Sequence, residues 1–161
     1  MPSKTIILGL GNTILTDDGA GIYVVRDIES LLRSKSRISI KEASVGGFNF
    51  VDLLSGYDRA VIIDAIHTKG GTPGDFYELD PAALKPSARL SSLHQIDFAT
   101  ACELAKRMGV PFPNEIAIFV MEVKDEFSFG ESPTPKVAEA IPKMAESIVK
   151  TLDERGWLKG E

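Results

Sequence analysis

Short, continuous apolar runs alternate with helical patterns along the whole chain, and this alternation constrains the fold more than any other feature. Runs that are apolar on both faces are typical of strands buried within a sheet. Helices between such strands cover both faces of a mostly parallel sheet. We therefore predict a three-layer α/β/α sandwich around a mostly parallel, twisted sheet of about five strands. The strand-like runs are residues 5–10, 38–43, 60–66, 76–79 and 115–123.

Helical patterns fill the intervals between these runs. Ser92 and Gln95 match a capping box and predict a helix start at Ser92. Thr134 followed by Pro135 predicts the N-cap and first residue of the last helix, and Pro142 is expected to bend it. The expected helical segments are residues 19–33, 48–54, 92–109 and 135–152.

Composition narrows the class of protein. With 161 residues and 43% hydrophobic side chains, we expect one folded domain over residues 1–161. A net charge of −5 and a pI near 5.1 disfavour a nucleic-acid-binding protein. Cys102 is the single cysteine, so an intramolecular disulfide and a cysteine-built metal site are both excluded. No apolar run is long enough to cross a membrane and no secretory signal is evident, so we expect a cytoplasmic protein.

The carboxyl ends of the predicted strands are where functional groups should gather, because loops meet helix starts there. This rule selects Asp17 and Asp18 after the first strand, Asp64 at the end of another, and the helix start near His94. Acids before a helix are stabilised by its macrodipole, and one of the pair suffices as a cap. The second acid is then available to the crevice. Asp64 follows a buried apolar run, where desolvation of a carboxylate is costly unless a cation or amides compensate.

The two histidines, His67 and His94, limit any metal site to one that includes carboxylates. Near a helix start the imidazole of His94 is biased towards the neutral form, which can ligate a metal. An ordinary exposed histidine is the alternative there, and His67 can equally reach the site or stay solvated. Two carboxylates and an imidazole suit a divalent metal with open coordination positions rather than a closed structural zinc site.

Two other sites are disfavoured by the sequence. The glycines at 9 and 11 follow the first strand, but Ile14 stands where a dinucleotide-binding fingerprint needs its third glycine. No Gly-x-Ser-x-Gly elbow supports a serine hydrolase.

Four motifs together resemble those of the hydrogenase maturation endopeptidases, the nickel-dependent proteases that trim the C-terminus of [NiFe]-hydrogenase large subunits. The resemblance spans nearly the whole chain, and the long first motif is specific. The segment at 45–47 departs from the Gly-Thr type of many members, which bears on partner choice rather than on ligands. The four motifs are residues 9–21 (GLGNTILTDDGAG), 63–66 (IDAI), 92–95 (SLHQ) and 132–135 (SPTP).

The resemblance implies that Asp18, Asp64 and His94 are the metal ligands and the candidate catalytic residues, while Asp17 does not bind metal. It also implies that nickel is supplied by the substrate, a [NiFe]-hydrogenase large-subunit precursor, although other divalent ions can occupy the isolated site. We expect a monomer, because a protein partner must reach the crevice.

Two alternatives stay open from the sequence. The opening residues also resemble peptidyl-tRNA hydrolases, but their RNA substrate needs a cationic surface that this acidic chain does not predict. A metal-sensing binding module or chaperone would recognise the nickel-loaded subunit without cutting it. The sequence also leaves open whether a carboxylate or the metal activates water in the protease.

Overall fold

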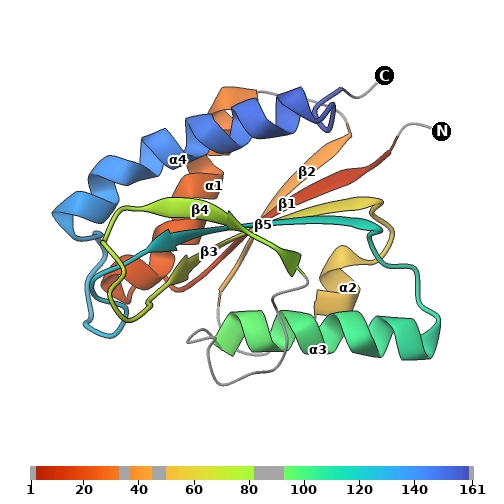
Figure 1. Cartoon of the computed structure of the whole chain (residues 1–161), viewed down its shortest axis with the longest axis horizontal. Helices are drawn as coiled ribbons and strands as arrows, with labels where there is room; N and C mark the ends of the chain where they lie inside the picture. The colour runs from red at the N-terminus through yellow and green to blue at the C-terminus, as the bar shows by residue number, and fades with distance from the viewer. Residues whose placement is uncertain (1–2, 33–36, 45–49, 82–92, 160–161) are drawn as a thin grey trace.

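The computed structural model describes residues 3–32, 37–44, 50–81 and 93–159, with only the backbone course for residues 93–99. Strands and helices alternate as predicted (Figure 1). Each predicted strand is present, with bounds that shift by no more than one residue. In chain order the elements are β1 Thr5–Leu10, the 3₁₀ turn η1 Thr16–Gly19, α1 Ala20–Leu32, β2 Ile38–Ala43, α2 Phe50–Leu54, β3 Arg59–Ile66, β4 Phe76–Leu79, α3 Leu93–Met108, β5 Glu115–Glu122 and α4 Pro135–Glu154.

The sheet has five strands in the order β2-β1-β3-β5-β4. The first four run parallel, and β4 pairs antiparallel with β5 at the edge. The predicted mostly parallel α/β sandwich is therefore confirmed. No helix in the described part of the chain is long and apolar enough to cross a membrane.

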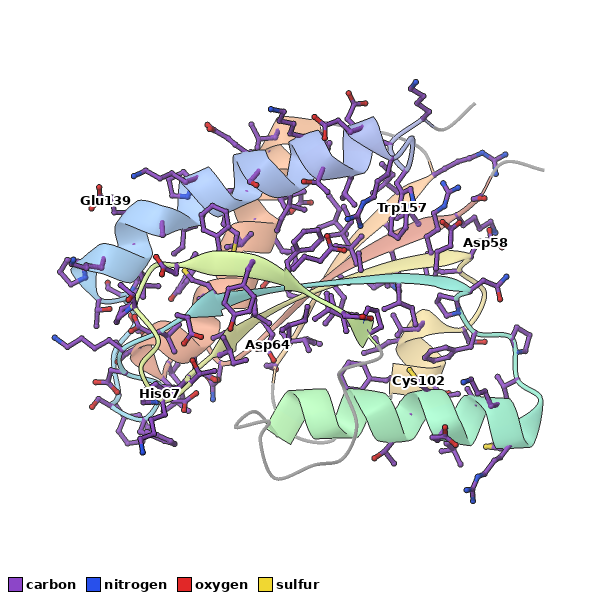
Figure 2. The ribbon with its side chains drawn as sticks, viewed as in Figure 1. Asp58, Asp64, His67, Cys102, Glu139 and Trp157 are labelled. Atoms are coloured by element: carbon purple, nitrogen blue, oxygen red, sulfur yellow. The ribbon has the colours of Figure 1, made fainter. Side chains whose placement is uncertain are left out.

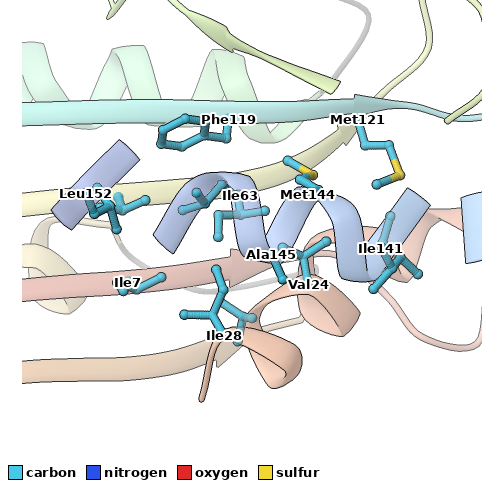
Figure 3. Close-up of a cluster of buried hydrophobic side chains, with 14 of the residues drawn as sticks. Ile7, Val24, Ile28, Ile63, Phe119, Met121, Ile141, Met144, Ala145 and Leu152 are labelled. Carbon is cyan, nitrogen blue, oxygen red and sulfur yellow. The ribbon is translucent and has the colours of Figure 1, made fainter. Parts of the chain in front are cut away.

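Alternating side chains on each strand divide the core between the two faces of the sheet. On one face, Ile7 and Ile63 pack with residues of α1 and α4, as Figure 3 shows. On the other face, Leu8 and Ile62 pack with residues of α2 and α3. The two helical layers leave the carboxyl ends of the parallel strands at one edge of the molecule (Figure 1).

The helix ends agree in part with the sequence signals. Gly109 closes α3 with φ +64°, as predicted for a C-terminal glycine. Pro135 is the first residue of α4, and Thr134 occupies its N-cap position. The hydroxyl of Thr134 does not cap α4, however; it donates to the carboxylate of Asp17. The predicted capping residue Ser92 lies outside the described residues.

Candidate active site

The order in which the chain adds strands to the sheet reverses between β1 and β3, and the predicted acids lie on these two strands or directly after them. From β1 the chain passes through α1 to β2 on one side, whereas β3 flanks β1 on the other side. The helices α1 and α2 pack on opposite faces. In open α/β sheets the crevice outside such a switch point is the usual ligand site. Asp18 follows β1 and Asp64 belongs to β3, so the two acids come from neighbouring strands beside this switch point.

Asp64 is a buried carboxylate within β3, with 1% of its surface exposed. The predicted run of 60–66 already extended two residues beyond Asp64, and β3 does continue to Ile66, where it is still paired with β5. Pairing with β1 ends one residue earlier, at Ile63. Asp64 is two residues from both Ile62 and Ile66, so the three lie on the same face of the strand. Ile62 and Ile66 pack into the layer of α2 and α3, and Asp64 therefore lies on that face. Its Oδ1 accepts the backbone N–H of Ala65 at 2.8 Å.

Asp18 lies in η1, the turn that joins β1 to α1, and its side chain is half-buried. Its Oδ2 accepts the backbone N–H of Asn12 at 2.9 Å, which closes the loop after β1. Gly21 explains how this loop comes near Asp64. A Cβ at Gly21 would lie 2.4 Å from the carbonyl oxygen of Ile63 and 2.6 Å from that of Leu10. Only glycine therefore lets the start of α1 sit directly on the ends of β1 and β3.

Asp17 has a structural role that the sequence did not predict. It is fully buried, and its carboxylate accepts the backbone N–H groups of Lys124 at 3.0 Å, Asp125 at 2.9 Å and Thr134 at 2.6 Å. The Thr134 hydroxyl also donates to it, at 2.8 Å. The sequence analysis expected one acid of the pair to cap the helix without saying which; the carboxylate of Asp17 instead fastens the β5–α4 loop to η1. The neighbouring Asp18 does not share these partners.

His94 is the second residue of α3, and the structure gives only the backbone course of that turn. The helix α3 covers the face of the sheet on which Asp64 lies. In Figures 1 and 2, this helix begins on the side of the molecule on which His67 is labelled. No group of three potential metal ligands comes together among the side chains that the structure describes. The assignment of Asp18, Asp64 and His94 as ligands thus stays a prediction.

His67 follows β3 at the rim of this edge (Figure 2). Its side chain is 51% exposed, and its Nδ1 lies 3.7 Å from Oε1 of Glu126 in the β5–α4 loop. When protonated, the imidazole can form an ion pair across the two loops. This position fits a loop residue better than a buried ligand.

Glu122 is a buried acid that the sequence reasoning missed. It ends β5 with 4% exposure and accepts the N–H and the hydroxyl of Thr68 at 3.2 and 2.6 Å. The hydroxyl of Tyr77 donates to it at 2.8 Å. Burial and this hydrogen bond raise the pKa of Tyr77 to about 12. The signal that could have found Glu122 is the one that found Asp64, a carboxylate at the end of an apolar run.

Comparison with known proteins identifies the family. The family model described as hydrogenase maturation protease matches residues 22–151. The chain belongs to this family. As a hydrogenase maturation protease it is a hydrolase, and the resemblance drawn from its motifs is confirmed.

Two relatives found by sequence and one solved structure agree with this membership. The hydrogenase expression/formation protein HupD of Rhizobium leguminosarum bv. viciae is 27% identical over 156 residues, covering 96% of this chain and 75% of the relative. The hydrogenase 2 maturation protease of Escherichia coli K12 is 25% identical over 154 residues, covering 95% and 93%. The structure of the hydrogenase maturating endopeptidase HybD from E. coli superposes with a TM-score of 0.79 at 25% identity, covering 95% of this chain and 94% of that one.

Proposed function

We propose that this protease removes the C-terminal extension of a [NiFe]-hydrogenase large-subunit precursor after nickel insertion. It recognises the substrate's nickel through Asp18, Asp64 and His94. The observation that carries the proposal is the arrival of two acids, from η1 and β3, at the switch point of a hydrogenase maturation protease. The carboxylate of Asp17 is bonded to the β5–α4 loop, whereas that of Asp18 accepts the backbone N–H of Asn12 in the loop after β1.

The chemistry of these ligands suits a metal that belongs to the substrate. Two carboxylates and one imidazole leave coordination positions open on a divalent ion. In the precursor, cysteine thiolates hold the nickel, and the protease completes its coordination. Cleavage then reports that nickel insertion is finished, because a precursor without nickel lacks the group that the site recognises. In isolation the same residues can hold another divalent ion.

Two routes to water activation fit these residues, and one substitution separates them. A carboxylate such as Asp64 can take the proton of the attacking water, or the metal can polarise the scissile carbonyl or the water. Asp64→Asn keeps an oxygen that can contact nickel but cannot accept the proton. Nickel-dependent binding without cleavage in this variant would assign the base to Asp64. Retained cleavage would assign activation to the metal.

The test of the function compares nickel-loaded with nickel-free precursor from the same genome. Each form is incubated with the protease, and the size shift of the large subunit is followed by electrophoresis and mass spectrometry. We expect the loaded form alone to lose a C-terminal peptide. Equal cutting of both forms would refute nickel recognition, and stable association without cutting would favour a nickel-sensing chaperone instead.

The two histidines offer a matched pair of variants for the same assay. We expect His94→Ala to abolish cleavage of loaded precursor while the far-ultraviolet circular dichroism spectrum stays unchanged. His67→Ala should cut normally, because its exposed side chain faces Glu126 at the rim. Full activity of His94→Ala would remove that residue from the site.

A further inference from the structure

Two phenylalanines stand almost fully in solvent beside the candidate site. Phe127 is 78% exposed and Phe129 is 86% exposed, the highest values among the large hydrophobic residues that the structure describes. Ile14, which is 49% exposed, lies next to them, because the N–H of Gly130 donates to its carbonyl oxygen at 2.9 Å. Large apolar side chains exposed on neighbouring segments are typical of interaction sites on folded proteins. We call Ile14, Phe127 and Phe129 the phenylalanine platform.

The platform is held in place by hydrogen bonds on both sides of the phenylalanines. Oδ1 of Asp125 accepts the N–H groups of Phe127 and Ser128 at 3.1 and 2.9 Å. The hydroxyl of Thr16 donates to the carbonyl oxygen of Ser128 at 2.6 Å. The N–H of Thr16 donates to the carbonyl oxygen of Gly130 at 2.9 Å. The phenylalanine segment is therefore a constrained loop that presents its aromatic rings outward, so a partner would not have to order it.

The same bonds place the platform next to Asp18. Ile14 and Asp18 belong to one short loop, in which the N–H of Asp18 donates to the carbonyl oxygen of Leu15 at 2.9 Å. Asp17, between them, accepts hydrogen bonds from the base of the phenylalanine loop. The β5–α4 loop and η1 lie at the same end of the sheet in Figure 1. Any protein that brings a scissile segment to Asp18 therefore passes close to the platform.

The charges around the rings indicate the kind of protein surface that fits. Residues 124–131 contain Lys124 against Asp125, Glu126 and Glu131, so one positive and three negative charges give a net charge of −2. An apolar surface bordered by acids complements an apolar segment bordered by lysines or arginines. A second copy of this chain would bring the same acids face to face.

We propose that the phenylalanine platform is the docking surface for the protein substrate. It binds an apolar segment flanked by basic residues, outside the nickel site, and it sets affinity rather than chemistry. This proposal rests on the proposed function, because it takes the large-subunit precursor as the occupant. Aromatic side chains at the centre of an interface commonly carry much of its affinity.

The test uses Phe127→Ser/Phe129→Ser and a matched control, Leu31→Ser/Met108→Ser. The control also removes two exposed apolar side chains, 50% and 62% exposed, but from α1 and the end of α3. Cleavage of nickel-loaded precursor is followed as a function of its concentration, and binding is measured separately by biolayer interferometry. We expect the platform variant to raise KM and Kd by about tenfold or more, the loss typical of interface aromatics, with kcat within about twofold. The control should match wild type, and added salt should weaken wild-type binding.

Each outcome separates the platform from the proposed function. Cleavage by the platform variant with unchanged KM would refute the platform and leave the protease intact. Binding without cleavage by the wild-type chain would refute the protease, while the Kd comparison would still test the platform. A wild-type dimer in light scattering that becomes monomeric in the platform variant would make a second copy the occupant and overturn the proposal.

Discussion

Replacing Asp17 by alanine should destabilise the fold far more than replacing the neighbouring Asp18. The Asp17 carboxylate is fully buried and accepts four donors, which are three backbone N–H groups and the hydroxyl of Thr134. Each donor left without a partner costs about 1–3 kcal/mol. Water can enter beside the half-buried Thr134, so the lower figure applies. Four donors then give about 3–5 kcal/mol, a large share of a typical stability of about 5–15 kcal/mol.

Urea unfolding, followed by circular dichroism, measures this loss directly. With a slope of about 2 kcal/mol per molar, the midpoint of Asp17→Ala should fall by about 1.5–2.5 M. Asp17→Asn keeps one accepting oxygen and turns an NH₂ group towards the remaining donors, so its loss should be about half. Thr134→Val removes only the hydroxyl donor, at about 1 kcal/mol. In the double variant the two losses should not add, because the hydroxyl bonds to the same carboxylate.

Asp18→Ala supplies the contrast. Its half-buried carboxylate accepts the backbone N–H of Asn12 at 2.9 Å, and loss of this bond should cost about 1 kcal/mol of stability. Cleavage of nickel-loaded precursor should nevertheless disappear. A loss below about 1 kcal/mol for Asp17→Ala would refute the reasoning, since the four donors would then be satisfied without the carboxylate. Equal losses for the two alanine variants would refute the division of roles between the acids.

Two further predictions concern the frame of the site. Gly21→Ala would place a methyl group against two backbone oxygens, at 2.4 and 2.6 Å, and should lower stability by about 3 kcal/mol and the melting temperature by about 6–12 °C in calorimetry. For Tyr77, the folded pKa of about 12 lies above the ordinary value of 10.0, so the stability from its neutral hydroxyl is complete below about pH 10 and is lost as the pH rises towards 12. Urea midpoints between pH 8 and 11 should therefore fall less steeply at the alkaline end for Tyr77→Phe than for wild type.

Much of this fold follows from local sequence patterns. The runs at 5–10 and 60–66 are apolar on both faces, as expected for strands of a sheet that helices cover on both sides. Because these strands alternate with helical patterns, the sequence predicts helical crossovers between parallel strands. In such sheets the functional site lies at the carboxyl ends of the strands. The single turn of 3₁₀ helix before α1 was not predicted, because acids and glycine suit several kinds of helix start.

The parts of the site that escaped prediction depend on contacts far apart in the chain. Asp17 and Thr134 are separated by 117 positions, and no local spacing indicates that one will hold the other. Thr134 is at the N-cap position that its sequence context predicts, yet its hydroxyl donates to the buried carboxylate of Asp17. A charged acceptor forms a stronger hydrogen bond than a neutral one. Asp64 was found because its signal, an acid after a buried run, is local. The exposure of Phe127 and Phe129 depends on a loop closed by residues of η1 and its neighbours, so the sequence did not predict it.

The geometry of η1 explains why two consecutive acids can take separate roles. In a 3₁₀ turn, successive side chains point about 120° apart, so Asp17 and Asp18 cannot face the same surroundings. One carboxylate enters the β5–α4 loop, and the other stays with the loop after β1. The structural acid therefore fixes the position of the proposed ligand and of the phenylalanine platform at once. Loss of Asp17 should affect both substrate affinity and cleavage, whereas loss of Asp18 should affect cleavage while the platform stays in place.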